Sequence, residues 1–307
     1  MSKTILFFGN ERLATGVTTK TPILNELVSY GYDVKAILVP YQAPVKSRKS
    51  RPLEVVKFAN DNNIPLISLS SLKNAIGDLK KYEAPLGILA AFGKIIPQEI
   101  IDIFPKGIIN IHPSLLPKHR GSTPIEGPIL LGEKETGVSI MQLTKDMDAG
   151  PVFDQIKIPL SGEESKQDLA DKLGILGARR LVELLPDILN GSVTPKEQSS
   201  ENISYDSRIS PRIGLLDFTK PAKTLEREIR AYLDWPRSTT KINQKPVIIT
   251  RSHAIDAVTT KPGKFKTLNG DLAVETSNGV LVIDRLIPAN SKEMDSKDYL
   301  KGHPLND

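Results

Sequence analysis

The sequence predicts an α/β protein: a doubly wound, mostly parallel sheet followed by a small C-terminal β-barrel of the oligonucleotide-binding (OB) type. Three observations support this prediction. Up to residue 143, short apolar runs alternate with stretches of helical periodicity, which is typical of parallel sheets covered by helices. After Trp235 the apolar runs are separated by Asn269-Gly270 and Asn278-Gly279, the strongest short signal for a β-hairpin. A length of 307 residues favours two domains over one.

The expected strands of the first domain are apolar runs joined by helices: residues 4–9, 34–39, 65–69, 86–92, 108–112 and 138–143. Between the first two runs, Thr21-Pro22 predicts a helix start, with Thr21 as N-cap and Pro22 at the first helical position. Sites in such sheets lie at the carboxyl ends of the strands. Because His112 ends one run and Asp148 follows another, both are expected at the same edge of the sheet.

The rest of the chain predicts a linker and a second domain. Residues 163–189 have the apolar spacing of one or two amphipathic helices that cover the sheet. Serines and prolines without periodicity follow, as in a connection between domains. We therefore expect a catalytic domain at 1–190, a linker at 191–213 and an OB-like barrel at 214–307.

Composition limits the class of protein. The chain has no cysteine, which excludes disulfides, thiolate nucleophiles and cysteine-bound zinc. The first ten residues lack the length of apolar sequence that a signal peptide or membrane span needs, so a cytoplasmic location is expected. Up to residue 207 the chain has 24 basic and 24 acidic residues, and after it 17 and 12. This local basicity suits a polyanion such as nucleic acid, although a mildly basic surface is also common.

Two short segments carry polar groups suited to acyl transfer. Asn110 and His112 lie two residues apart on one strand, so alternation puts both side chains on one face. An amide donor beside an imidazole suits a carbonyl oxygen that becomes negative. In the loop after residue 143, either Asp146 or Asp148 can orient His112 and favour its protonated form. Alone, each segment also fits an ordinary explanation: a strand-end histidine in a satisfied hydrogen bond, and an aspartate-rich turn.

Together these segments resemble the folate-dependent formyltransferases. The resemblance rests on residues 110–117 (Asn-Ile-His-Pro-Ser-Leu-Leu-Pro), Gly121, the strand at 137–142 and Asp148-Ala149-Gly150, in that family's order and separation. It implies a formyltransferase-type fold and catalytic roles for Asn110, His112 and Asp148, with none for Asp146. It also implies that the formyl donor, 10-formyltetrahydrofolate, contacts a turn and a loop that include Ser114, Leu115, Leu116, Pro117, Phe92, Gly93, Ile95 and Ile96.

The resemblance covers nearly the whole chain and extends to the branch of the family that acts on methionyl-tRNA. Length, residues 229–232 and Trp235-Pro236 match that branch, whereas the glycinamide ribonucleotide members are usually one shorter domain. In this branch a basic loop enters the acceptor end of the tRNA, which implies that role for Lys46, Arg48, Lys49 and Arg51. Gly9-Asn10-Glu11 departs from the family's usual Gly-Thr-Pro, so how the methionyl end is held does not follow from the resemblance.

The expected activity is transfer of the formyl group of 10-formyltetrahydrofolate to the α-amino group of initiator methionyl-tRNA, giving N-formylmethionyl-tRNA for translation initiation. Asn110 and protonated His112 would stabilise the tetrahedral oxyanion. Asp148 would hold His112 and help to move the amine proton, through water, towards the leaving nitrogen. The expected partners are initiator methionyl-tRNA and folate, bound by a monomer, with no metal and no membrane.

Two alternatives stay open on the sequence alone. A sugar-nucleotide N-formyltransferase would use the same three residues, and a non-catalytic RNA-binding relative would keep the fold. Two other classes are excluded. Gly9 and Gly16 do not form the Gly-x-Gly-x-x-Gly fingerprint of a nicotinamide dehydrogenase. His112 and His119 lack the spacing and the acid of a His-Glu-x-x-His zinc site.

Overall fold

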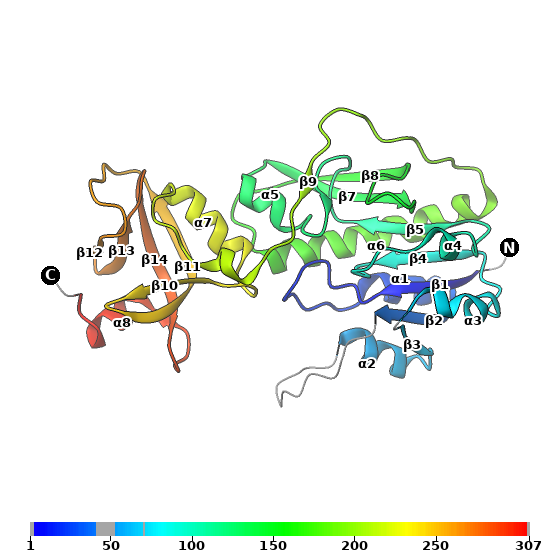
Figure 1. Ribbon diagram of the computed structural model, residues 1–307, viewed down its shortest axis with the longest axis horizontal. Helices are drawn as coiled ribbons and strands as arrows, with labels where there is room; N and C mark the ends of the chain where they lie inside the picture. The colour runs from blue at the N-terminus through cyan, green and yellow to red at the C-terminus, as the bar shows by residue number, and fades with distance from the viewer. Residues whose placement is uncertain (1–2, 41–52, 70, 306–307) are drawn as a thin grey trace. The chain divides into compact units, whose positions relative to one another are not determined.

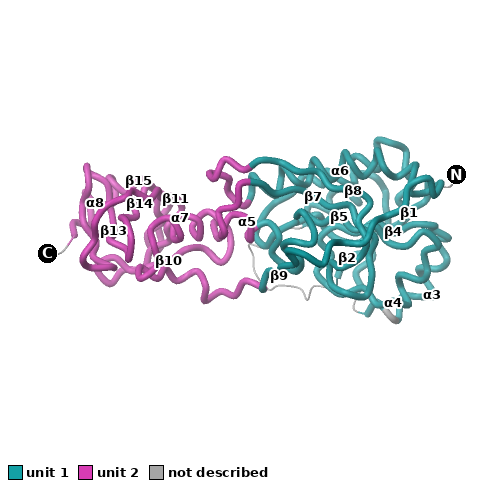
Figure 2. The backbone as a smooth tube through the Cα atoms, turned by 90° about the horizontal axis from the view of Figure 1, so that it is seen from above, with its two compact units in different colours: residues 1–125, 135–159, 167–207 teal, residues 126–134, 160–166, 208–307 magenta. Residues whose placement is uncertain are grey.

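The computed structural model describes residues 3–40, 53–69 and 71–305, and the chain divides into two compact units. Unit 1 comprises residues 1–125, 135–159 and 167–207, and unit 2 comprises residues 126–134, 160–166 and 208–307 (Figure 2). Within the described ranges, no helix is both long and apolar enough to cross a membrane.

Unit 1 is built on a seven-stranded sheet in the order β3-β2-β1-β4-β5-β7-β8 (Figure 1). Its strands are β1 (Thr4–Gly9), β2 (Asp33–Pro40), β3 (Leu66–Leu69), β4 (Leu86–Ala90), β5 (Ile108–His112), β7 (Glu135–Gln142) and β8 (Val152–Pro159). The first five are parallel to one another, and β7 and β8 continue the sheet in antiparallel pairing. The predicted mostly parallel α/β sheet is confirmed, whereas β8 has no counterpart among the predicted strands.

Helices and short bridging strands complete unit 1. They are α1 (Pro22–Ser29), α2 (Glu54–Asp61), the 3₁₀ turn η1 (Lys73–Ala75), α3 (Ile76–Lys80), α4 (Gln98–Ile101), α6 (Lys166–Asn190), whose first residue belongs to unit 2, and the two-residue strands β6 (Arg120–Gly121) and β9 (Tyr205–Asp206). An apolar core lies against β1, β2 and β4, with Phe8 edge-on to both Phe92 and Phe104. Buried apolar runs of this kind are what parallel strands require when helices cover their sheet.

Unit 2 carries an antiparallel sheet in the order β10-β11-β14-β13-β12, with β15 on β14. Its strands are β10 (Ser238–Ile242), β11 (Lys245–Ile255), β12 (Phe265–Leu268), β13 (Asp271–Glu275), β14 (Val280–Pro288) and β15 (Met294–Asp295), and its helices are α5 (Glu126–Leu131), η2 (Pro211–Gly214), α7 (Ala222–Ala231) and α8 (Ser296–Gly302). Asn269-Gly270 turns β12 into β13 with both residues at positive φ, as the hairpin signal predicts. The sheet packs around its own core, which includes Leu225, Ile249 and Tyr299, in agreement with the predicted small barrel.

Candidate active site

Strand β5 positions Asn110 and His112. It pairs with β4 on one side, where Asn110 lies opposite Leu89, and with β7 on the other, where His112 lies opposite Ser139. Pairing on both sides fixes the strand, and alternation along it directs the two side chains to one face. Both residues are buried. Among the described residues, no hydrogen bond is formed by the side-chain amide of Asn110, so that amide is available to a bound group.

Asp148 completes the predicted trio. Its Oδ1 lies 3.6 Å from Nδ1 of His112, which is longer than a hydrogen bond but close enough for the carboxylate to form an ion pair with a protonated imidazole. Its Oδ2 accepts a hydrogen bond of 2.8 Å from the backbone N–H of Gly121. The backbone of Asp148 is left-handed, with φ 48°, and its carbonyl oxygen accepts a hydrogen bond from Nε2 of Gln198. Asp148 is therefore held on both its main chain and its side chain.

His112 and Asp148 lie close together, as predicted. The predicted reason, that both follow strands whose carboxyl ends share one edge of the sheet, is wrong. Since β7 is antiparallel to β5, its last residue, Gln142, pairs close to Ile109, at the start of β5. The carboxyl ends of these two strands thus lie at opposite edges of the sheet, separated by about 10 Å at roughly 3.3 Å per residue. The loop between β7 and β8 must return along the sheet to bring Asp148 to His112.

The hydrogen bonds of His112 define its tautomer. Its Nε2 lies 2.9 Å from the backbone carbonyl oxygen of His119. A carbonyl oxygen can only accept, so Nε2 carries a proton and donates it there. Nδ1 is then the ring nitrogen that faces Asp148 and remains open to chemistry.

The predicted folate turn, residues 114–117, is tied to the neighbouring strands through its polar groups. The Ser139 hydroxyl donates to the carbonyl oxygen of Ser114 (2.6 Å) and accepts from the N–H of Leu116 (3.1 Å). Gln155 donates to the Leu116 carbonyl oxygen, and the Ser114 hydroxyl donates to the Lys118 carbonyl oxygen. Ser114 and Leu116 are buried, whereas Leu115 and Pro117 are partly exposed. The turn is thus rigidly placed directly after His112.

The predicted folate loop divides into core and accessible residues. Phe92 and Ile96 are buried in the core of unit 1, and Phe92 contacts Phe8 with ring centroids 5.8 Å apart. Ile95 is 71% exposed, and Gly93 is exposed with φ +73°. Of the four predicted loop residues, Ile95 and Gly93 are therefore open to a ligand in this conformation. The predicted tRNA-binding residues Lys46, Arg48, Lys49 and Arg51 lie outside the described residues.

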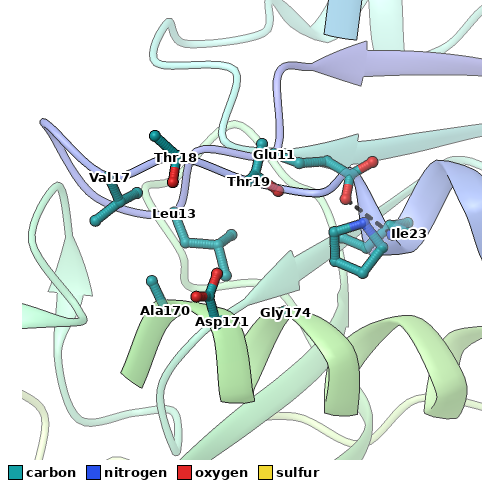
Figure 3. A pocket seen from close by; sticks show the side chains of 10 residues that line it. Glu11, Leu13, Val17, Thr18, Thr19, Ile23, Ala170, Asp171 and Gly174 are labelled. Atoms are coloured by element: carbon teal, nitrogen blue, oxygen red, sulfur yellow. Dashed lines mark hydrogen bonds between the residues drawn. The ribbon is translucent and has the colours of Figure 1, made fainter. Parts of the chain in front are cut away.

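A small pocket lies between the loop that follows β1 and helix α6 (Figure 3). Its lining includes Glu11, Leu13, Val17, Thr18, Ala170 and Asp171. The buried Glu11 carboxylate accepts hydrogen bonds from the N–H groups of Ile23 (2.8 Å) and Leu24 (2.9 Å), at the start of α1. Burial raises the pKa of Glu11 to about 8, although both of these hydrogen bonds lower it. The unusual Glu11 is thus a structural cap in this conformation.

The prediction that Thr21 caps α1 is wrong for its side chain. Thr21 occupies the N-cap position, with Pro22 following as predicted, but its hydroxyl donates to the carbonyl oxygen of Lys20 and accepts from no backbone N–H of the helix. Glu11 satisfies the N–H groups that an N-cap side chain normally binds. A cap supplied from so far along the chain carries no local sequence signal.

The residues that support the trio were not predicted from the sequence. Gln198 donates to the carbonyl oxygens of Asp148 and Gly150, both at 2.8 Å. β9 pairs with β6 in parallel, so the segment after α6 lies beside the loop that carries His119 and Gly121. Serine content predicts this segment only as a linker, and nothing local indicates its contacts. For the described part of the chain, no group of three or more metal-ligating side chains is found.

Comparisons with known families agree with this geometry. A family model described as "Formyl transferase" matches residues 15–185, and one described as "Formyl transferase, C-terminal domain" matches residues 208–304. The chain is 34% identical to the "Methionyl-tRNA formyltransferase" of Listeria innocua, over 93% of each chain. It is 30% identical to the protein of the same name from Thermodesulfovibrio yellowstonii, over all of this chain and 98% of that one.

Solved structures share the fold at lower identity. HypX from Aquifex aeolicus, solved in complex with tetrahydrofolic acid, superposes with a TM-score of 0.66 at 18% identity; the match covers 98% of this chain and 48% of that longer one. WlaRD, described as a sugar 3N-formyl transferase, superposes with a TM-score of 0.67 at 20% identity, over 95% of this chain and all of that one. At such identities the likeness concerns the fold alone.

Proposed function

This chain belongs to the methionyl-tRNA formyltransferase family, and from that premise we propose that it formylates the α-amino group of initiator methionyl-tRNA. The formyl donor is 10-formyltetrahydrofolate, and the product is the N-formylmethionyl-tRNA used in translation initiation. The observation that carries the proposal is the grouping of the buried Asn110 and His112 with the partly buried Asp148 in unit 1, with one imidazole nitrogen facing a fixed carboxylate. This arrangement fits acyl transfer to an amine.

The reaction forms one C–N bond and breaks another. The methionine amine attacks the formyl carbon, and the tetrahedral intermediate carries a negative oxygen. Collapse of the intermediate breaks the bond to N10 of the folate, and the proton lost by the amine replaces the formyl group there. No oxidant or metal is required for this balance. The protein has to stabilise the oxyanion and provide a route for the proton.

Each residue of the trio has a proposed role. The Asn110 amide and the protonated Nδ1 of His112 donate to the oxyanion. His112 can present Nδ1 because its Nε2–H is engaged by the His119 carbonyl oxygen. Asp148 lies beside the His112 ring through its Oδ1 and accepts the amine proton, through water, for delivery to N10.

We propose that substrate recognition lies outside the trio. The rigid turn at Ser114, Leu115, Leu116 and Pro117 and the loop with Gly93 and Ile95 border the folate, with Phe92 and Ile96 supporting that loop from the core. Lys46, Arg48, Lys49 and Arg51 contact phosphates of the acceptor end, and the domain at 214–307 holds the rest of the tRNA. The excess of basic residues after residue 207 supports tRNA binding by the domain at 214–307. A monomeric state and a cytoplasmic location remain predictions.

The acceptor is best tested by offering the candidate acceptors in parallel. Purified protein is given 10-formyltetrahydrofolate with initiator methionyl-tRNA, elongator methionyl-tRNA, glycinamide ribonucleotide or an amino-sugar nucleotide, and formylated product is measured for each. We expect product from initiator methionyl-tRNA. Exclusive use of the amino-sugar nucleotide would overturn the tRNA acceptor, and no product from any acceptor would indicate a non-catalytic relative.

A further inference from the structure

Residues 204–206, which we call the brace, contact the loop that fixes both His112 and Asp148. The Ser204 N–H donates to the Pro117 carbonyl oxygen (3.3 Å), and the Ser204 carbonyl oxygen accepts from the N–H of Arg120 (2.9 Å). Within the brace, β9 pairs residue by residue with β6, so that Asp206 lies opposite Gly121. An added Cβ on Gly121 would lie 2.8 Å from the Asp206 carbonyl oxygen, so the two backbones are in close contact.

His119 is the residue through which the brace reaches His112. The Ser204 hydroxyl accepts the backbone N–H of His119 at 2.8 Å. Asp206 Oδ2 lies 2.9 Å from Nδ1 of the His119 ring, which donates to it. The carbonyl oxygen of His119 is the group that accepts the Nε2–H of His112. One buried residue is thus held on its side chain and its N–H while its carbonyl oxygen fixes His112.

The backbone of His119 needs this support. Its φ is +57°, in the left-handed region that residues other than glycine rarely adopt. Such a conformation persists where surrounding contacts determine it. Without the contacts from Ser204 and Asp206, His119 would relax towards ordinary backbone angles and its carbonyl oxygen would turn away from His112.

We propose that Ser204 and Asp206 are positioning residues, which act through His119 to keep a proton on Nε2 of His112, so that Nδ1 is the nitrogen that takes up and donates the proton in catalysis. Without this anchor the His112 ring can rotate or change tautomer, and Nδ1 is no longer held towards Asp148. The proposal rests on the reaction proposed above for its consequence in turnover. Its structural content, the state of the His112 ring, can be measured without any substrate.

The chain offers a matched control. His253 and Asp284 in unit 2 also pair Nδ1 with a carboxylate oxygen at 2.9 Å, but the His253 side chain is 55% exposed. Replacing Asp284 removes the same type of contact far along the sequence from the trio. Asp206→Ala and Ser204→Ala are therefore compared with Asp284→Ala.

Two measurements test the proposal. The first is long-range ¹H–¹⁵N correlation NMR, which reports which ring nitrogen is protonated; only four histidines contribute signals. The second is the separation of kcat from KM for methionyl-tRNA. In Asp206→Ala and Ser204→Ala we expect the NMR pattern of His112 to change from that of a ring protonated on Nε2. We expect kcat to fall roughly 10–100-fold, the loss typical when a residue that orients a metal-ligating side chain is removed. KM should change little. Asp284→Ala should keep the wild-type NMR pattern of His112 and the wild-type kcat.

The outcomes that overturn the proposal are distinct. If Asp206→Ala keeps the wild-type His112 pattern, the brace does not set the tautomer, whatever happens to turnover. If Asp206→Ala unfolds, Ser204→Ala decides, because it removes a different contact to His119. If the wild type fails to formylate methionyl-tRNA, the proposed function fails, but the NMR comparison still tests the brace.

Discussion

Two histidine–aspartate pairs of the same chain differ in a way that separates structure from chemistry. His253 and Asp284, in the sheet of unit 2, lie 2.9 Å apart, with side chains 55% and 29% exposed. His112 and Asp148, in unit 1, lie 3.6 Å apart, with side chains 5% and 14% exposed. The closer pair contributes little to stability, because water screens the interaction. The looser pair is much less exposed to solvent, and each partner is also anchored elsewhere, His112 by His119 and Asp148 by Gly121. Burial and anchoring, more than short distance, distinguish a site capable of catalysis.

The largest expected effect comes from neutralising the carboxylate of the buried pair. Asp148→Asn can still accept the N–H of Gly121, so the loop is expected to stay in place. It can no longer take up a proton, and kcat should fall by roughly 10²–10⁴. Steady-state kinetics with initiator methionyl-tRNA measure the loss. Asp284→Asn is the control and should keep full activity; equal effects of the two changes would contradict the comparison.

Asn110→Ala removes a proposed oxyanion donor and should lower kcat by roughly 10²–10³, or about 3–4 kcal/mol of barrier. The affinity for methionyl-tRNA should be preserved, because the amide acts on the developing charge. Asn60, exposed on α2, provides the control substitution Asn60→Ala, for which no change is expected. A folded Asn110→Ala protein with near-normal turnover would remove Asn110 from the catalytic group.

Gly121→Ala tests the anchoring of Asp148. Gly121 has φ +109°, and an added Cβ would lie 2.8 Å from the Asp206 carbonyl oxygen. We expect a loss of about 1–3 kcal/mol in the free energy of unfolding, measured by urea denaturation, together with reduced kcat. Gly162 has φ +91° but open space around it, so Gly162→Ala should cost less and leave kcat unchanged. Equal costs at both positions would show that the contact with Asp206 does not matter.

Glu11→Gln tests the buried cap by its pH dependence. Burial raises the pKa of Glu11 from an ordinary 4.5 to about 8, so the folded state binds the proton more tightly than the unfolded chain. The stability linked to this proton is complete below pH 4.5 and is lost as the pH rises to about 8. The wild type should therefore lose stability relative to Glu11→Gln across this interval, by up to about 5 kcal/mol, since each pH unit between the two pKa values is worth about 1.4 kcal/mol. Parallel pH profiles in thermal unfolding would contradict the assignment.

The sequence predicts features that depend on neighbouring residues better than features that depend on residues far apart in the chain. β5 is predicted to the residue, because a buried strand is a continuous apolar run and a polar residue marks its end. β8 is missed, since an edge strand with exposed polar positions such as Gln155 and Lys157 gives only a weak pattern. The antiparallel turn of the sheet at β7 is missed as well, and with it the path by which Asp148 reaches His112.

The supporting contacts of the site were beyond sequence reasoning for a physical reason. Asp206 meets His119 across 87 positions, and Gln198 meets Asp148 across 50. Such contacts depend on the packing of the whole unit, not on local propensity. Motif and strand end predict which residues carry the chemistry, whereas only the structure identifies what holds them.

The central claim is that the buried histidine performs the chemistry and the exposed one does not. His112→Asn and His253→Asn apply the same substitution to both, and single-turnover transfer from 10-formyltetrahydrofolate to initiator methionyl-tRNA measures the consequence directly. We predict that His112→Asn lowers the transfer rate roughly 10²-fold or more and that His253→Asn keeps the wild-type rate. A folded His112→Asn protein that transfers the formyl group as fast as the wild type would contradict the account.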